Sequence, residues 1–251
     1  MLLKGKIALV TGSSRGIGAA IAALFARQGA KVVVHGRDVA ALRKVQEEIT
    51  GGGGQAIPVV ADLTRFDEVE AMRRRIESEY GVADVLIANA GGSHTPPAPF
   101  EQITEDGWRA SIEGNLTATF LTIKSFLPSM KARGSGSIIT LSSSAGRRPN
   151  PRSPIPYAAA KAGIQILTQD LAVELGPAGI RVNCIAPETI LTERNLGWIP
   201  KAQQESLVQM HPIRRLGTPG DVAEAALFLA TEASSWITGL VLDVAGGAVM
   251  V

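Results

Sequence analysis

The stretch Thr11-Gly12-Ser13-Ser14-Arg15-Gly16-Ile17-Gly18 stands between a short apolar run, Ile7–Val10, and an amphipathic pattern, Ile17–Gln28. Its three glycines, spaced GxxxGxG, allow a tight turn and a close approach of the backbone to a ligand. The start of a helix adds unpaired N–H groups and a positive partial charge, which together favour a phosphate. The stretch therefore predicts a strand, a turn that holds the pyrophosphate of a dinucleotide, and a helix.

Outward from this turn, short apolar runs alternate with amphipathic segments along the chain. The strand-like runs are Ile7–Val10, Val32–His35, Ile57–Ala61, Val85–Ala88, Ser137–Leu141, Arg181–Ile185 and Leu240–Val244. The helical patterns are Ile17–Gln28, Val39–Ile49, Phe66–Tyr80, Glu105–Lys131, Tyr157–Leu175 and Asp221–Ala230. Uninterrupted apolar runs are typical of parallel strands that are covered on both faces. The order predicts a single doubly wound α/β domain over residues 1–251, with a parallel seven-stranded sheet between two helical layers.

The composition excludes several classes of protein. Of the 251 residues, 45% are hydrophobic and 19% are charged, and the net charge of +2 comes without a basic stripe, so we expect a globular chain with no nucleic-acid partner. No apolar stretch approaches the roughly 18 residues of a membrane span, and the N-terminus has no signal-peptide pattern. The three histidines are isolated, which predicts no metal site. A single cysteine, Cys184, suits the cytoplasm.

The end of the second strand bears on the choice of cofactor. An acidic residue at this position typically holds the 2′-hydroxyl of NAD, and an arginine accommodates the 2′-phosphate of NADP. Arg37 follows the strand directly, and Arg15 in the first turn is within reach of the same phosphate. Asp38 keeps NAD possible, but its place favours a helix cap. The sequence therefore favours NADP over NAD.

Tyr157 and Lys161 are four residues apart, which puts both side chains on one face of a helix. Pro154 and Pro156 just upstream favour a helix start at this place. A nearby ammonium and a helix N-terminus both favour the phenolate, so we expect the pKa of Tyr157 to lie below its reference value near 10. A tyrosine of this kind is a competent general acid and base, although such a pair alone is also typical of a solvated helix face.

Together with these elements, the sequence resembles the short-chain dehydrogenase/reductase family from about Lys6 to Gly247, and most of all its 3-oxoacyl-carrier-protein reductase branch. The motifs that carry the resemblance occur in the family's order. They are Thr11…Gly18, Ala61-Asp62-Leu63, Asn89-Ala90-Gly91, Asn115 in Glu113-Gly114-Asn115, Ser143 in Leu141–Gly146, and Tyr157…Lys161.

The resemblance implies a role for each residue of a catalytic set. Tyr157 exchanges the proton with the substrate oxygen, and Lys161 tunes Tyr157 and binds the nicotinamide ribose. Ser143 polarises the same oxygen. Asn115 holds a water that connects Lys161 to solvent. Ser142 and Ser144 compete for the role of Ser143, but alternation along a strand points both to the opposite face.

Cofactor contacts follow from the first turn and from the resemblance. The residues assigned to them are Gly12, Ser14, Arg15, Gly16, Ile17, Gly18, Arg37, Asp62, Leu63, Asn89, Ala90, Gly91, Tyr157, Lys161, Pro187, Ile190 and Thr192. Structural roles stay open for several of these polar residues: a turn cap for Ser143, a contact within a long helix for Asn115, a loop stabiliser for Asn89 and a helix cap for Asp62.

One position departs from the family. After the sixth strand the family usually has Pro-Gly, whereas this chain has Pro187-Glu188. If the glycine normally has a positive φ, we expect Glu188 to be accommodated by strain or by a changed loop. Its side chain is then either solvated or in contact with substrate.

Two segments are expected to line a substrate pocket at the carboxyl edge of the sheet, Gly92–Phe100 and a helical lid over about residues 189–212. The apolar tail Gly247–Val251 favours burial against another subunit, so we expect a homotetramer. The resulting function is hydride transfer between a nicotinamide cofactor and a small carbonyl compound or secondary alcohol. A non-catalytic dinucleotide sensor on the same fold is the alternative, and the sequence does not name the substrate.

Overall fold

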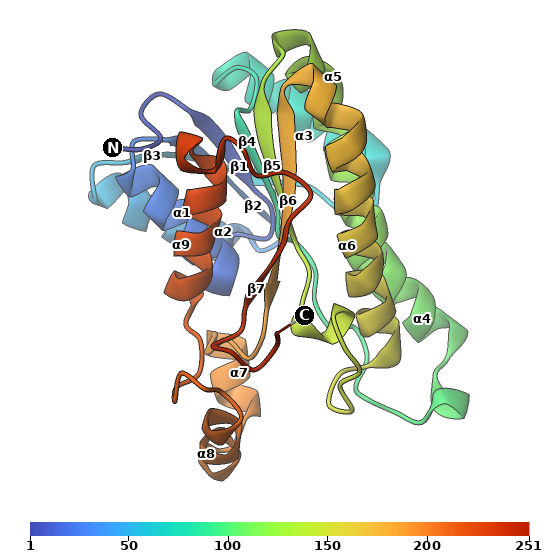
Figure 1. Ribbon diagram of the computed structural model, residues 1–251. Helices are drawn as coiled ribbons and strands as arrows, with labels where there is room; N and C mark the ends of the chain where they lie inside the picture. The colour runs from blue at the N-terminus through green and yellow to red at the C-terminus, as the bar shows by residue number, and fades with distance from the viewer. Residues whose placement is uncertain (251) are drawn as a thin grey trace.

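The computed structural model describes residues 1–250, with all side chains except those of Trp198 and residues 201–203. Seven parallel strands form one sheet in the order β3-β2-β1-β4-β5-β6-β7 (Figure 1). The strands are β1 Ile7–Val10, β2 Lys31–Gly36, β3 Gln55–Val60, β4 Val85–Ala88, β5 Gly136–Leu141, β6 Ile180–Pro187 and β7 Val241–Val244. The predicted doubly wound fold is confirmed, and the predicted strands differ only by shifted ends.

The strand order reverses direction at β1, which pairs with β2 on one side and with β4 on the other. Leu9 is the register partner of Val33 and of Leu86, and all three side chains are buried. Both faces of the sheet are covered, which explains the uninterrupted apolar runs. Ligands of open α/β sheets bind where the order reverses, at the carboxyl ends of the strands.

Helices form two layers around the sheet. The first layer holds α1 Gly16–Arg27, α2 Val39–Gly51 and α9 Pro219–Ala230, and the second holds α3 Phe66–Glu79, α4 Glu105–Ile112, α5 Ala118–Arg133 and α6 Ile155–Leu175 (Figure 1). Each layer packs its own apolar core against the sheet. Short 3₁₀ segments cover Phe100–Gln102, Ser144–Gly146, Gly176–Ala178 and Glu232–Ser234.

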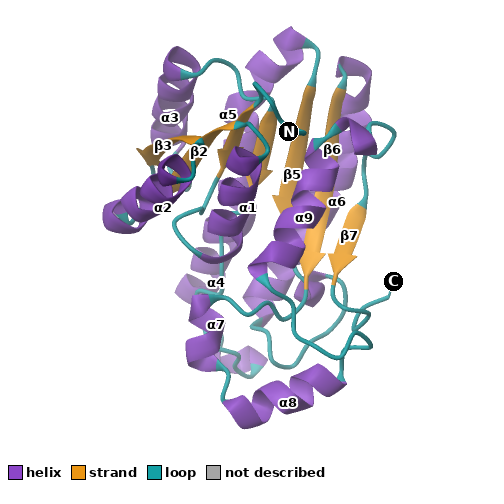
Figure 2. Cartoon of the chain, turned by 90° about the vertical axis from the view of Figure 1, so that its left-hand side faces the viewer, coloured by secondary structure: helices purple, strands orange, loops and turns teal. Residues whose placement is uncertain are grey.

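Residues 189–212 contain two helices, α7 Glu193–Trp198 and α8 Lys201–Gln209. Figure 2 shows both beyond the carboxyl ends of the strands. The helical character expected for this segment is therefore present. The C-terminal tail differs in part from its prediction, because Val249 is buried within its own chain while Met250 is exposed. Val251 lies outside the described residues.

The helix predicted over Glu105–Lys131 is interrupted. A π-helical stretch, Glu113–Thr117, separates α4 from α5. A π turn widens the helix by one residue and is often found at functional sites. Here Gly114 leaves room for the His94 ring, and Asn115 bonds to the backbone of Gly92. Local helix propensity therefore yields to contacts with the segment that follows β4.

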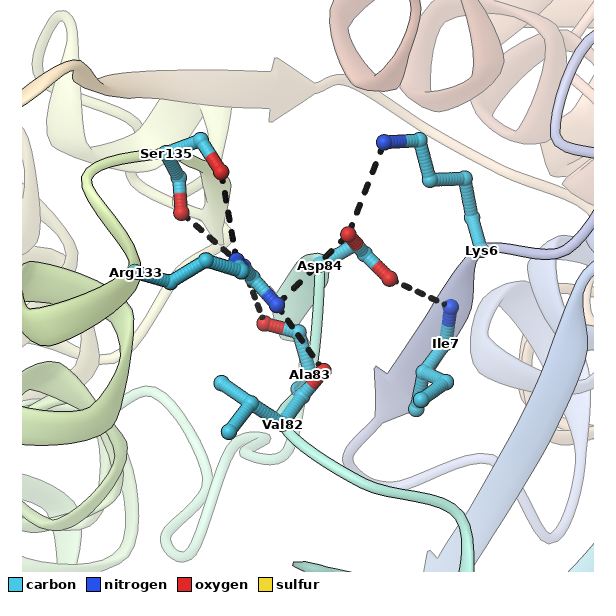
Figure 3. A network of polar contacts seen from close by, with 7 residues as sticks. All are labelled: Lys6, Ile7, Val82, Ala83, Asp84, Arg133 and Ser135. Atoms are coloured by element: carbon cyan, nitrogen blue, oxygen red, sulfur yellow. Dashed lines mark hydrogen bonds and ion pairs between the residues drawn. The ribbon is translucent and has the colours of Figure 1, made fainter.

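At the amino ends of the strands, a polar network fixes β1 beside β4 (Figure 3). One oxygen of Asp84 accepts from the backbone N–H of Ile7 at 2.9 Å, and the other lies 3.5 Å from both Lys6 and Arg133. Arg133, the last residue of α5, also donates to the carbonyl of Ala83 at 2.8 Å. The network sits at the edge opposite the one where ligands bind, so it holds in place the two strands at which the order reverses.

Candidate active site

A cleft of about 1050 Å³ opens at the carboxyl ends of the strands. Of the residues assigned to the cofactor from the sequence, all but Ile190 line it. Ile190 is buried behind the cleft, where it bridges to Gly217. Its backbone is therefore held in place by the fold rather than exposed on the cleft wall.

The glycine-rich turn forms the floor of the cleft. Gly12 and Gly16 have φ values of +64° and +57°, which side-chain-bearing residues rarely adopt. A Cβ on Gly18 would lie 2.8 Å from the Cα of Ser13, so no side chain fits there. Arg15 is the N-cap of α1 and makes no side-chain cap bond, which leaves the first N–H groups of the helix without a side-chain partner. This geometry fits a pyrophosphate.

Asn89 holds the turn from the neighbouring strand end. Its amide nitrogen donates to the carbonyl of Thr11 at 2.8 Å and to that of Gly12 at 3.1 Å. The Thr11 hydroxyl accepts in return from the backbone N–H of Asn89 at 3.0 Å. The loop-stabilising role that the sequence left open for Asn89 is present in the structure.

His35 at the end of β2 is a contributor that sequence reasoning missed. It accepts from the N–H of Gly12 at Nδ1, 3.2 Å away, and its Nε2 lies 3.1 Å from the carbonyl of Ala61. A backbone N–H can only donate, so the proton of the neutral ring resides on Nε2. Burial lowers the pKa of His35 to about 4, which keeps the ring neutral. Its place at the end of a strand beside the glycine turn was the available signal.

Asp38 caps α2, as its position in the sequence indicated. One carboxylate oxygen accepts from the N–H of Ala41 at 3.1 Å, and the other pairs with Arg15 at 3.0 Å. Arg37 lines the cleft beside them. The end of β2 therefore presents two guanidinium groups and a carboxylate that is already engaged.

Asp62 also lines the cleft, but it does not cap α3. Its carboxylate accepts from the backbone N–H of Thr64 at 2.9 Å and from the Thr64 hydroxyl at 2.8 Å, and these bonds lower its pKa. The N-cap of α3 is Arg65, which makes no side-chain cap bond. Asp62 stabilises the turn before the helix, so the helix-cap interpretation is wrong by three positions.

Tyr157 and Lys161 project from the first turns of α6 into the cleft. The Nζ of Lys161 lies 5.6 Å from the centre of the Tyr157 ring and donates to the carbonyl of Leu141 at 2.7 Å. Loss of hydration on burial lowers the pKa of Lys161 to about 8. The helix thus begins at Ile155, close to where its two prolines predict, with both side chains on one face.

The pKa of Tyr157 does not move in the expected direction. Burial raises it above the ordinary value, and the hydrogen bond from Ser143 and the charge of Arg194 oppose this only in part. Lys161 does not lower it, because the Lys161 pKa of about 8 lies below that of Tyr157 and the ammonium has lost its proton before the phenol ionises. The sequence spacing predicted that both side chains share one face, but not that burial would shift both pKa values.

Three adjacent serines differ in their hydrogen-bond partners. The hydroxyl of Ser143 is hydrogen-bonded to the phenol of Tyr157 and also accepts from the N–H of Ala145 at 3.2 Å. Ser142, which is buried but also lines the cleft, donates instead to the backbone carbonyl of Lys161 at 2.7 Å. Ser144 is buried as well. Ser143 alone of the three therefore bonds to Tyr157.

Asn115 is fully buried, and its side chain lies behind the cleft. Its amide exchanges two hydrogen bonds of 3.0 Å with the backbone of Gly92 and donates to the carbonyl of Ser111 at 2.8 Å. The polar contact that the sequence left open for Asn115 is therefore present. It joins the π turn to the segment after β4.

Arg194 and His94 also line the cleft, and sequence reasoning missed both. Arg194, on α7, donates to the carbonyl of Ser93 at 3.3 Å. The two segments expected around the substrate, residues 92–100 and 189–212, therefore touch across the mouth of the cleft. The charge of Arg194 contributes to lowering the pKa of His94, after the larger effects of burial and Arg37.

Glu188 causes no backbone strain, because no residue other than glycine has a positive φ in residues 1–250. Its side chain is neither solvated nor in the cleft, contrary to both expectations. It is buried against His211.

Within the described residues, no group of three or more Asp, Glu, His or Cys side chains is placed to hold a metal ion. None of the helices in that part of the chain has the length and hydropathy to cross a bilayer.

Comparisons with known proteins agree with this geometry. A family model described as enoyl-(acyl carrier protein) reductase matches residues 12–249. The chain is 40% identical to the 7alpha-hydroxysteroid dehydrogenase of Escherichia coli, covering 98% of this chain and 95% of that one. It is also 40% identical to a 3-oxoacyl-(acyl-carrier-protein) reductase of Chlamydia muridarum, covering 98% of both chains.

Solved structures show the same likeness. A 3-oxoacyl-(acyl-carrier protein) reductase of Brucella melitensis superposes with a TM-score of 0.94 at 37% identity, over 100% of this chain and 93% of the other. A 7 alpha-hydroxysteroid dehydrogenase in complex with NADH and 7-oxo glycochenodeoxycholic acid gives 0.93 at 39% identity, over 98% and 94%. With the glycine turn and the Tyr157–Lys161 pair in one cleft, these matches show that the chain is an oxidoreductase of the short-chain dehydrogenase/reductase family.

Proposed function

We propose that this chain transfers hydride between NADP(H) and a small carbonyl compound or secondary alcohol, with Tyr157 as the general acid and base. One observation carries the proposal. The phenol of Tyr157, hydrogen-bonded to Ser143, and the ammonium of Lys161 line the same cleft as the glycine-rich turn. A proton donor and a dinucleotide cradle in one cleft are what a reduction of this kind requires.

The nicotinamide supplies or accepts the hydride when it is bound, and the protein orients it and moves the proton. In reduction, the Oη of Tyr157 gives its proton to the carbonyl oxygen, and in oxidation it takes the hydroxyl proton. Ser143 donates to the same oxygen and stabilises the charge that develops there. Its existing bond to Tyr157 keeps the two hydroxyls within reach of one oxygen atom.

Lys161 binds the nicotinamide ribose and favours the phenolate of Tyr157. With a pKa of about 8, Lys161 is largely protonated at neutral pH. Its charge then opposes the effect of burial on the pKa of Tyr157, once the ammonium turns from Leu141 towards the cleft. Asn115, at the π turn beside the cleft, holds a water that connects Lys161 to solvent. Through this water the proton that Tyr157 gives to the substrate is replaced.

Two arginines support the preference for NADP. Arg37 lines the cleft at the end of β2, and Arg15 lines it from the glycine turn. Both oxygens of Asp38 are already engaged, by Ala41 and by Arg15, so this carboxylate is poorly placed for a ribose hydroxyl. NAD stays the alternative, since relatives with NADH or NAD bound superpose on this chain.

We also propose that residues 189–212 close over a small-molecule substrate, that the chain works as a homotetramer, and that it does so in the cytoplasm. The contact of Arg194 with Ser93 supports the lid. Exposed apolar side chains on three helices of one layer, Trp108, Phe120 and Val173, support association with further copies. The single free cysteine, Cys184, supports a reducing compartment.

A Tyr157→Phe variant tests the proposed activity, with Tyr80→Phe as the matched control at the chain's other tyrosine. Oxidation of NADPH is followed by absorbance on a panel that includes 7-oxosteroids, 3-oxoacyl thioesters and 4-oxocyclohexanecarboxylate. We expect Tyr157→Phe to lose roughly 10²-fold or more in kcat and Tyr80→Phe to lose nothing, while both bind NADPH like the unmodified protein. Unchanged turnover in Tyr157→Phe, or NADPH binding without turnover of any compound by the unmodified protein, contradicts the proposal and favours the sensor.

A further inference from the structure

Two titratable side chains outside the catalytic set are buried against each other. The Oε2 of Glu188 lies 3.0 Å from the Nε2 of His211, and the two side chains are only 7% and 3% exposed. Glu188 directly follows β6, and His211 lies just beyond the end of α8. The pair therefore joins the first and last parts of the lid segment, which are 23 positions apart in the chain.

The partners of the pair require a proton between the two side chains. The Nδ1 of His211 faces the carbonyl of Leu207 at 2.7 Å, and a carbonyl only accepts, so Nδ1 carries a hydrogen. The Nε2 faces the Glu188 carboxyl, whose pKa is lowered by the N–H of Thr189 and by His211, against the effect of burial. One hydrogen is therefore shared between Nε2 and the Glu188 carboxyl, which ties the two buried side chains together.

Neighbouring backbone fixes both ends of the pair. The N–H of Glu188 donates to the carbonyl of Val244 at 3.2 Å, and its carboxylate accepts from the N–H of Thr189. On the other side, a Cβ on Gly246 would lie 3.3 Å from the His211 ring, and Ile213 donates to the carbonyl of Gly246 at 3.0 Å. The pair thus connects the ends of β6 and β7 with the end of α8.

The segment that starts at this pair enters the proposed nicotinamide side of the cleft. Pro187 precedes Glu188 and lines the cleft, and so does Thr192 four residues further on. Thr192 also packs over the glycine turn, because a Cβ on Gly16 would lie 3.3 Å from its Cγ2. Displacement of residues 189–192 therefore changes the cleft at this place and leaves the end of β2 untouched.

We propose that Glu188 and His211 are positioning residues, a latch that holds residues 189–192 and the base of the lid in the place that receives the nicotinamide ring. The proposal rests on the proposed function. The latch takes over the work of the glycine that the family usually has at position 188. In relatives with that glycine the turn would be set by backbone conformation, and in this chain it is set by the contact between Glu188 and His211. Breaking the latch leaves the fold intact and weakens the grip on the nicotinamide half of the cofactor.

The test compares two ligands that differ only in the nicotinamide ring, NADPH and 2′-phospho-ADP-ribose. Their Kd values are measured by calorimetry on the full chain and on the variants Glu188→Ala and Glu188→Gly. Glu205→Ala is the control, because it removes an exposed carboxylate from the same lid helix without touching the pair. We expect the Kd for NADPH to rise at least fivefold in both Glu188 variants, and the Kd for 2′-phospho-ADP-ribose to stay within twofold.

Hydrogen exchange on the protein without ligand gives a second readout. We expect the amides of Thr189 and His211 to exchange at least tenfold faster in Glu188→Ala, while those of β1 and β4 keep their protection. The double variant Glu188→Ala/His211→Ala removes both buried partners and leaves neither without the other, so it replaces a single variant that does not fold. We expect it to discriminate between the two ligands as Glu188→Ala does.

Two outcomes overturn the latch: equal losses for both ligands, which indicate general destabilisation, and no loss for either ligand. Failure of the proposed function has a different signature, because the unmodified protein would then either not bind NADPH or bind it without turning over any compound of the panel. Unchanged exchange at Thr189 and His211 in Glu188→Ala would also refute the latch, whatever the cofactor preference of the chain.

Discussion

The ammonium of Lys161 donates a hydrogen bond to the backbone carbonyl of Leu141 at 2.7 Å, and so ties α6 to the end of β5. A second connection runs the other way, from the hydroxyl of Ser142 to the carbonyl of Lys161 at 2.7 Å. Gln165, one turn further along α6, donates to the same hydroxyl at 2.8 Å. The helix that carries Tyr157 is thus fixed to the strand end that carries Ser143.

The burial of Lys161 predicts a stability that rises with pH. Its pKa is about 8 in the folded chain and 10.5 in the unfolded chain, so between these values the unfolded state binds more protons. The Lys161→Met variant lacks this titration. From pH 8 to pH 9, we expect the unfolding free energy of the unmodified protein to gain about 1 kcal/mol relative to Lys161→Met. Urea denaturation at the two pH values measures the difference in unfolding free energy between the two proteins. A difference that stays constant with pH would show that burial does not lower the pKa of Lys161.

Replacement of Ser143 and replacement of Ser142 are expected to have different effects on the protein. Ser143→Ala removes a donor to the reacting oxygen, so kcat should fall roughly 10²-fold with little change in stability. Ser142→Ala leaves the buried amide of Gln165 without its partner, which costs about 1–3 kcal/mol of unfolding free energy. Turnover and denaturant midpoints measured side by side separate the two effects. If Ser142→Ala lost turnover and kept its stability, the assignment of the two hydroxyls would be reversed.

Features that the sequence predicted well are local or follow from strand direction. Apolar runs mark buried parallel strands, and the carboxyl ends of such strands meet at one edge, so Asp62 and Asn89 could be brought to one cleft without a structure. The prolines before Tyr157 indicated the start of its helix. The cap at Asp38 followed from the glycine turn that precedes it.

The features that the sequence did not predict depend on contacts between distant segments. The ring of His35 was hidden because its partners, Gly12 and Ala61, come from two other strand ends. Glu188 was expected to be strained or exposed, since nothing in the sequence pairs it with His211 across the lid. The π turn at Asn115 likewise depends on the loop after β4, so helix periodicity alone extended one helix through it.

The close packing of the glycine turn predicts that a single methyl group disrupts cofactor binding. In Gly18→Ala, the new Cβ would meet the amide of Asn89 at 2.6 Å and the Cα of Ser13 at 2.8 Å, so the turn must move. We expect the Kd for NADPH to rise more than tenfold and the unfolding free energy to fall by about 1–3 kcal/mol. Gly51→Ala is the control, because a Cβ there meets open space at the end of α2. Calorimetry measures the affinity of both variants for NADPH, and thermal melts measure their stability. Equal affinities in the two variants would show that the turn is not the pyrophosphate site.

The end of β2 predicts which cofactor is preferred. Arg37 lines the cleft, whereas Arg43 is exposed on α2 away from it, so Arg37→Ala and Arg43→Ala form a matched pair. A charge-assisted hydrogen bond to a phosphate contributes about 1.5–3 kcal/mol, which corresponds to roughly tenfold or more in affinity. We therefore expect Arg37→Ala to raise the KM for NADPH at least about tenfold and to leave the KM for NADH within twofold, while Arg43→Ala changes neither. An unmodified protein that prefers NADH would instead mean that Asp38 leaves Arg15 and the N-terminus of α2 to bind the ribose. In that case Asp38→Ala, not Arg37→Ala, would be the variant that loses the cofactor.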